Sequence, residues 1–232
     1  MSASFAATPV PPELPETQRP ADVPAKDFIY DYVKRLIVDL TLPPGHIVTE
    51  MDIAKVAGVS RTPVREAFLR LDAERLLQLL PRRGALVTTV TARQIRELHT
   101  TRLVLEAHAV AEIVARGIDV SAELSRLIER QQSLMDSEAG YPAVVECDRE
   151  FHTAIIRAVG NTELAHLYCS MGDRQQRTGV VAFSVQPGRA EMALGHHRQI
   201  AEALRLFDGE AAEAVLREHL DRHSWDLERY LP

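Results

Sequence analysis

The chain has 232 residues, of which 46% are hydrophobic and 26% are charged, a composition typical of a soluble globular protein. Aromatic residues make up only 5%, which disfavours binding of single-stranded nucleic acid by base stacking. The two cysteines, Cys147 and Cys169, form no paired motif and suggest no disulfide framework. No stretch approaches the roughly 18 apolar residues of a membrane span, and the N-terminus does not resemble a secretory signal. We therefore expect a cytoplasmic protein without a membrane partner.

The net charge of −6 is unevenly distributed along the chain. Residues 26–90 carry 10 Lys or Arg and 8 Asp or Glu, a net of +2, whereas the residues on either side are acidic. A basic segment inside an acidic protein is expected of a small DNA-facing module. Taken by itself, a difference of this size also arises by chance.

Residues 1–25 are rich in proline, which predicts a disordered tail. From Asp27 to Leu40 apolar residues recur at spacings of three and four, a pattern that predicts an amphipathic helix. The run Pro43-Pro44-Gly45 ends this helix.

Two shorter helices are predicted next. Thr49 lies three residues before Asp52, a weaker relative of the capping box, and opens a helix that continues to about Ala57. Gly58 allows a tight turn, after which Ser60 is a suitable N-cap for a third helix.

The segments 76–80 and 85–90 are β-prone, and Pro81-Arg82-Arg83-Gly84 between them predicts a hairpin loop. Three helices followed by a basic hairpin form a winged helix-turn-helix, which we assign to residues 26–90. Residues 91–232 lack strand signals and predict a second, all-helical domain. Its expected helices are 91–116, 121–138, 142–159, 161–184, 187–207 and 209–230. The predicted fold class is mainly α.

The third helix is the candidate for reading DNA, because the N-terminal residues of a recognition helix meet base edges in the major groove. Arg61 and Arg65 are four residues apart and share one face of that helix. Thr62 can donate to a phosphate, and the hairpin tip can reach the DNA backbone or minor groove. The candidate DNA-binding residues are Ser60, Arg61, Thr62, Arg65, Arg82, Arg83 and Gly84. The alternative interpretation is a helical subdomain with a solvated arginine face.

The sequence resembles a known family over this segment. Val48–Ala54, Gly58–Ala67, Leu69–Leu71 and Arg82–Gly84 are similar to the GntR family of bacterial transcription regulators, and the rest is similar to FadR-like members with an FCD ligand-binding domain. The resemblance implies a homodimer that binds palindromic operator DNA and releases it when a small metabolite binds. This chain has Met51 where many relatives have Arg, which leaves its operator sequence open.

Eight of the nine histidines follow residue 91. Asp148 and His152 share a helix face, and His197 and His219 lie on later helices, so the four can converge as a divalent metal site. Spacing alone is weak evidence; the FCD resemblance implies this Asp/His pattern. The expected ion is Zn²⁺, Ni²⁺ or Mn²⁺. His196 and His223 remain alternatives to His197 and His219.

Arg102 lies among apolar neighbours in the first helix of the second domain. Such an arginine often only extends its head to solvent. The FCD resemblance implies that it faces the cavity and pairs with an effector carboxylate, so we expect a small organic-acid effector.

These observations favour a metabolite-responsive regulator, and repressors predominate in the family that the chain resembles. The first alternative is a metal-dependent, hydrolase-like enzyme that uses the Asp/His site to activate water. No separate general base is apparent beside that site, since Glu150 points elsewhere on its helix. The second alternative is a helical interaction module without a ligand.

Overall fold

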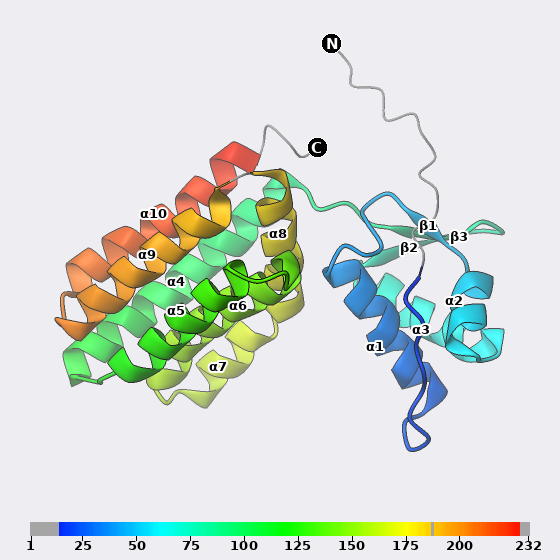
Figure 1. The fold of residues 1–232 in the computed structure, drawn as a ribbon, viewed down its shortest axis with the longest axis horizontal. Coiled ribbons are helices and arrows are strands. Elements are labelled where there is room, and N and C mark those ends of the chain that lie inside the picture. Colours follow the sequence, from blue (N-terminus) through cyan, green and yellow to red (C-terminus); the bar gives the residue numbers. More distant parts are fainter. Residues whose placement is uncertain (1–13, 187, 228–232) are drawn as a thin grey trace, which may run out of the picture. The chain divides into compact units, whose positions relative to one another are not determined.

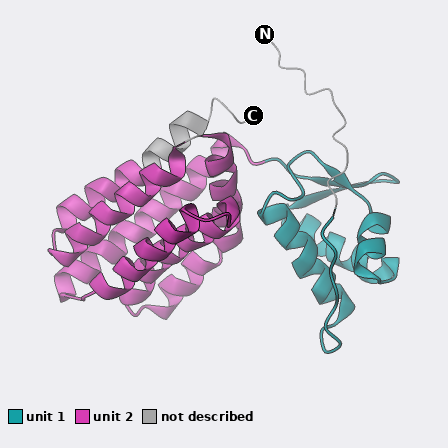
Figure 2. Ribbon diagram, viewed as in Figure 1, with its two compact units in different colours: residues 1–89 teal, residues 90–232 magenta. Residues whose placement is uncertain are grey.

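The computed structural model describes residues 14–186 and 188–227, with side chains described up to residue 220. The chain divides into two compact units, residues 1–89 and 90–232 (Figures 1 and 2). Each unit has its own cluster of buried apolar side chains.

The first unit combines three helices with a small antiparallel sheet (Figure 1). The helices are α1 (Ala25–Val38), α2 (Glu50–Ala57) and α3 (Arg61–Ala73), and the strands are β1 (Ile47–Val48), β2 (Leu77–Leu80) and β3 (Gly84–Val87). The strand order is β1-β3-β2, so the β2–β3 hairpin forms the wing. The predicted winged helix-turn-helix is confirmed, and the short strand β1, which the sequence did not predict, is an addition.

Local sequence explains where these helices begin and end. Thr49 caps α2 by accepting a hydrogen bond from the backbone N–H of Asp52, as the sequence predicts. Gly58 ends α2 with a φ of 63°, in the left-handed region that favours glycine. The helices pack through fully buried apolar residues, among them Ile29 of α1 and Phe68 of α3.

The predicted disordered tail falls partly outside the described residues, which begin at Leu14. Residues 14–24 form no helix or strand. Leu14 packs against the core, and the hydroxyl of Tyr32 donates to the carbonyl oxygen of Pro15 at 2.6 Å. This part of the segment is therefore anchored to the helix.

The second unit is a bundle of helices. They are α4 (Ala92–Arg116), α5 (Ser121–Met135), α6 (Gly140–Ala158), α7 (Thr162–Cys169), α8 (Gly172–Val185), α9 (Arg189–Arg205) and α10 (Gly209–Leu227). The mainly helical fold class is confirmed. Among the described residues, no helix is both long enough and apolar enough to cross a membrane.

One expected helix, 161–184, is two helices in the structure. The chain turns at Ser170 and Met171, between α7 and α8. The turn lets α7 bury Tyr168 against α4, whereas α8 packs against α6. At that second contact a Cβ on Gly179 would lie only 2.6 Å from a methyl group of Val145, so the close approach requires glycine.

Candidate metal centre and DNA-binding surface

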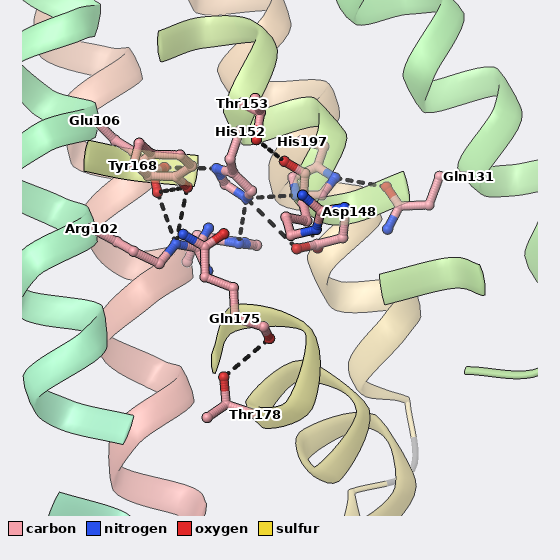
Figure 3. A network of polar contacts seen from close by, with 12 residues as sticks. Arg102, Glu106, Gln131, Asp148, His152, Thr153, Tyr168, Gln175, Thr178 and His197 are labelled. Atoms are coloured by element: carbon pink, nitrogen blue, oxygen red, sulfur yellow. Dashed lines mark hydrogen bonds and ion pairs between the residues drawn. The ribbon is translucent and has the colours of Figure 1, made fainter. Parts of the chain in front are cut away.

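Four ligand-type side chains converge inside the second unit. Asp148 and His152 come from adjacent turns of α6, His197 from α9 and His219 from α10, and one ligand atom from each lies within 4.8 Å of the others. Nε2 of His152 lies 3.1 Å from Nε2 of His219 and 3.2 Å from Nε2 of His197. Oδ1 of Asp148 lies 3.3 Å from Nε2 of His197. Figure 3 shows Asp148, His152 and His197 pointing toward one another.

A second layer of side chains fixes the imidazole rings. Nδ1 of His152 lies 2.7 Å from Oε2 of Glu106, and Nδ1 of His197 lies 2.7 Å from Oε1 of Gln131 (Figure 3). A carboxylate oxygen can only accept, so Nδ1 of His152 must donate to it. Nε2 of His152 then faces Nε2 of the other two rings, an arrangement that suits a bound cation.

Burial keeps two of the histidines, His197 and His219, in the neutral form that binds metal. His152, His197 and His219 are at most 1% exposed. Burial is the main cause that lowers the pKa of both His197 and His219 well below the usual range. Burial acts against ionisation of Asp148, whose pKa it raises, and a bound cation would offset this effect. Neutral imidazoles are metal donors, and their closest nitrogen spacings suit a metal at about 2.1 Å from each.

The residues therefore fit a divalent metal ion. Three imidazoles and one carboxylate suit a borderline metal, and hydrogen bonds from ligand rings to Glu106 and Gln131 are the outer contacts that orient such ligands. This set matches the four residues predicted from the sequence. His196 is buried but lies outside the four-residue cluster, and the alternative ligand His223 lies outside the residues whose side chains are described.

Arg102 is buried beside this centre. Its Nε donates to Oε1 of Glu106 at 2.9 Å and to the Tyr168 oxygen at 3.2 Å, and Tyr168 donates to the same carboxylate oxygen at 2.6 Å. Burial alone would raise the pKa of Glu106, but Arg102 and His152 hold it well below its usual range. Burial likewise opposes the charge of Arg102, and Glu106 outweighs it and raises the pKa. Glu106 thus links Arg102 to a metal-ligand histidine.

A small cavity of about 30 Å³ borders the centre. Asp148 and His219 reach it from the cluster, and Arg102 lines it from α4. Nη2 of Arg102 is buried there without a hydrogen-bond partner among the described residues. In this structure the cavity has room for a water molecule or a single small polar group.

Sequence reasoning missed the outer residues of the centre, Glu106, Gln131 and Tyr168. Only Glu106 carried a signal, since it lies four residues after Arg102 and the two pair along α4. Gln131 and Tyr168 reach the centre from α5 and α7 through packing that no local pattern encodes.

The first unit carries an open groove of about 560 Å³ between α3, the start of α2 and the tip of the wing. Its charged lining consists of four arginines and one glutamate, Glu50. The arginines are Arg61, Arg65, Arg82 and Arg83, all exposed. The excess of guanidinium groups beside the first turns of a helix suits phosphate and base-edge contacts.

The other candidates in this unit have different surroundings. Ser60 is the N-cap of α3, but its side chain makes no capping hydrogen bond, and both it and Thr62 are exposed. Gly84 has a φ of 103°, and a Cβ there would lie 2.5 Å from the Val48 carbonyl oxygen, so the sheet itself requires glycine. Met51 and Leu69 are apolar groove residues that are 57% and 52% exposed. Leu69 was not predicted.

Comparisons with known proteins agree with these two units. The family described as "Bacterial regulatory proteins, gntR family" matches residues 25–87, and the FCD domain family matches residues 97–222. HTH-type transcriptional repressor RspR from Escherichia coli (strain K12) is 30% identical over 213 residues, which cover 90% of this chain and 91% of that protein.

Solved structures share the fold. Escherichia coli McbR/YncC matches with a TM-score of 0.69 at 24% identity, over 90% of this chain and 99% of that one. A GntR transcriptional regulator from Rhodococcus sp. RHA1 matches with a TM-score of 0.69 at 25% identity, over 89% of this chain and 99% of that one.

The matched families and RspR are transcription regulators and not enzymes. Glu150, which lies between Asp148 and His152 in the sequence, forms an ion pair with Arg130. The hydrolase interpretation is therefore set aside. The chain belongs to the GntR family of bacterial transcription regulators, in the FadR-like group whose second unit is an FCD domain.

Proposed function

We propose that this protein is a metabolite-responsive repressor that binds double-stranded operator DNA as a homodimer in the cytoplasm. Its effector is a small organic acid bound beside a divalent metal ion, Zn²⁺, Ni²⁺ or Mn²⁺, held by Asp148, His152, His197 and His219. Repression is proposed because the relative RspR is named a repressor.

The observation that carries the effector site is the convergence of four ligand atoms next to a cavity lined by Arg102. The metal, when bound, supplies a positive Lewis-acid centre with a coordination position for an oxygen anion. Nη2 of Arg102 offers an N–H donor on the same cavity. Glu106 fixes the direction of both groups through its bonds to Arg102 and His152.

The size of the cavity implies how the signal arises. A volume of about 30 Å³ is too small for a whole organic acid, so binding must displace lining side chains. An effector shifts a conformational equilibrium only by its differential affinity for the two states. The effector then favours the conformation with the enlarged cavity, and the conformation with the closed cavity is the one that binds DNA.

On the DNA side, Ser60, Arg61, Thr62 and Arg65 would place the first turn of α3 in the major groove. Arg82, Arg83 and Gly84 would bring the wing to the backbone or minor groove. What supports this assignment is the arginine-lined groove between α3 and the wing. In a homodimer, two such modules would read the halves of a palindromic site.

Gel-shift titration with the promoter DNA of the protein's own gene region tests the proposal. We expect specific binding by the metal-loaded protein, about one divalent ion per subunit by elemental analysis, and release of DNA by an organic acid. Failure to bind that DNA, or protein that takes up no divalent ion, would contradict the proposal.

A further inference from the structure

The cavity beside the metal centre is lined by more positive groups than one carboxylate effector needs. Of the described residues that line it, three carry guanidinium groups, Arg102, Arg149 and Arg189, and only Asp148 carries a carboxylate. Arg102 is paired with Glu106, and Arg149 lies near Glu146 at the surface. The described lining of the cavity thus carries more positive than negative groups.

Arg189 differs from these two in its position and burial. It is the first residue of α9, it is only 1% exposed, and its Nη1 donates to the amide oxygen of Gln186 at 2.9 Å. Arg189 lines the cavity together with His99 and Arg102 of α4 and Asp148 of α6. Arg189 therefore contributes to the cavity from α9, whereas Arg102 does so from α4.

Gln175 supplies an unused polar group on the same cavity. Its side chain extends from α8 toward Arg102 (Figure 3), and the residue is 5% exposed. Neither the amide nitrogen nor the amide oxygen has a hydrogen-bond partner among the described residues. A buried amide left without partners is costly, and such a group is retained where a ligand completes its hydrogen bonds.

We propose that the effector carries two anionic oxygen groups, one held by Arg102 and the metal, the other by Arg189 and the amide of Gln175. A dicarboxylate and a phosphorylated acid share this chemistry. The inference rests on the proposed function, because it takes the metal-side cavity as the effector site. It adds the number of anionic groups and the residues that recognise the second one.

The same residues explain how a ligand larger than the present cavity enters. Moving the side chain of Gln175 breaks no protein hydrogen bond, so this wall yields at little cost. A second anionic group in the space so opened accepts hydrogen bonds from Arg189 and from the displaced amide of Gln175. Arg189 thereby selects for the second anion, and a monoanion of equal length leaves that part of the cavity unmatched.

The test is calorimetric titration of metal-loaded protein with matched acids of three to six carbons. Each pair contains a monocarboxylate and the dicarboxylate of the same length, and a third member carries phosphate in place of the second carboxylate. We expect at least one dianion to bind about tenfold or more tightly than its monoanionic partner. The proposal is overturned if no dianion binds more tightly than its partner. Metal content is measured after each titration, so that chelation by the acid is not read as binding.

Adjacent glutamines provide a matched pair of variants. Gln175→Met removes an unpartnered amide from the cavity, so we expect unchanged or higher thermal stability and about tenfold weaker dianion binding. Gln176→Met removes the donor to the Pro142 carbonyl oxygen, outside the cavity lining, so stability falls and affinity stays. Equal loss of affinity in both variants would show a purely structural role.

Arg189→Gln completes the test. It should weaken dianion binding about tenfold or more while the monoanion affinity stays within about twofold. Equal weakening of both would contradict the second anion site. Gel-shift affinity and metal content of the same preparations separate the outcomes: when both are intact and the dianion preference is absent, only this inference fails. Loss of DNA or metal binding by the wild-type protein is a failure of the proposed function.

Discussion

Nδ1 of His152 lies 2.7 Å from Oε2 of Glu106, and neither residue is exposed to solvent. This carboxylate accepts from a metal-ligand histidine with one oxygen and from Arg102 and Tyr168 with the other. The contact orients His152 and links the candidate metal centre to Arg102, which lines the adjacent cavity. Among the described residues, Glu106 thus contacts both a candidate metal ligand and an arginine of the cavity.

Glu106→Gln should lower metal affinity by about 10–100-fold, because the neutral amide orients His152 less firmly and makes it a poorer donor. Competition with a chromogenic chelator measures this affinity. Glu150→Gln on α6 is the control, since its surface pair with Arg130 does not reach the centre. Equal metal affinity in wild type and Glu106→Gln would show that the contact does not support metal binding.

His196 and His197 form a natural matched pair for the metal assignment. His197→Ala should abolish the rise in melting temperature on adding Zn²⁺ or Ni²⁺, because it removes a ligand. His196→Ala should keep that rise, since His196 lies outside the cluster. In the wild type, metal at about 100 times its Kd should add about 2.7 kcal/mol of stability. A thermal shift retained by His197→Ala would rule out this ligand set.

Arg65→Ala should weaken specific operator binding by about 1–3 kcal/mol, because an arginine contact at the start of α3 is lost. Adding Arg61→Ala should weaken it further. Lys55→Ala is the control, as Lys55 is exposed on α2 but does not line the groove. Gel-shift titration at one fixed salt concentration provides the measurement, and wild-type affinity in the double variant would refute the DNA-binding surface.

Gly84→Ala should destabilise the first unit by about 3 kcal/mol or more, since it adds backbone strain and a clash with the Val48 carbonyl oxygen. Gly45 also has a positive φ, but nothing lies within 4 Å of an added Cβ. Gly45→Ala should therefore lower the free energy of unfolding by only about 1–2 kcal/mol. Urea unfolding followed by circular dichroism compares the two. Similar losses in both variants would mean that the contact with β1 is unimportant.

Chelator-treated protein should lose stability as the pH falls. Burial, with Arg102 and Arg189 nearby, lowers the pKa of His99 to about 3. Between about pH 6.5 and 3 the unfolded chain binds a proton that the folded protein excludes. The free energy of unfolding therefore decreases as the pH decreases. This group alone should contribute a loss of about 2 kcal/mol at pH 5. His99→Gln should flatten the pH dependence of urea unfolding; an unchanged slope would show that His99 is protonated in the fold.

The sequence alone determined the features that depend on neighbours along the chain. The cap at Thr49, the turn at Gly58 and the apolar periodicities follow from local backbone and side-chain preferences. The pairing of Asp148 with His152 follows from the helical repeat, which places residues four apart on one face. The similarity to GntR and FCD proteins also lies in the sequence, because both family matches rest on residue identities.

Tertiary structure decided which groups meet. His196 and His197 are adjacent, and only the packing of α9 against α5, α6 and α10 selects the second for the cluster. Tertiary packing also decided the break between α7 and α8 and the short strand β1. It likewise brought Gln131 and Arg189 into the interior. Each depends on the rotation and distance of helices far apart in sequence, which close packing of the core fixes and local propensity does not.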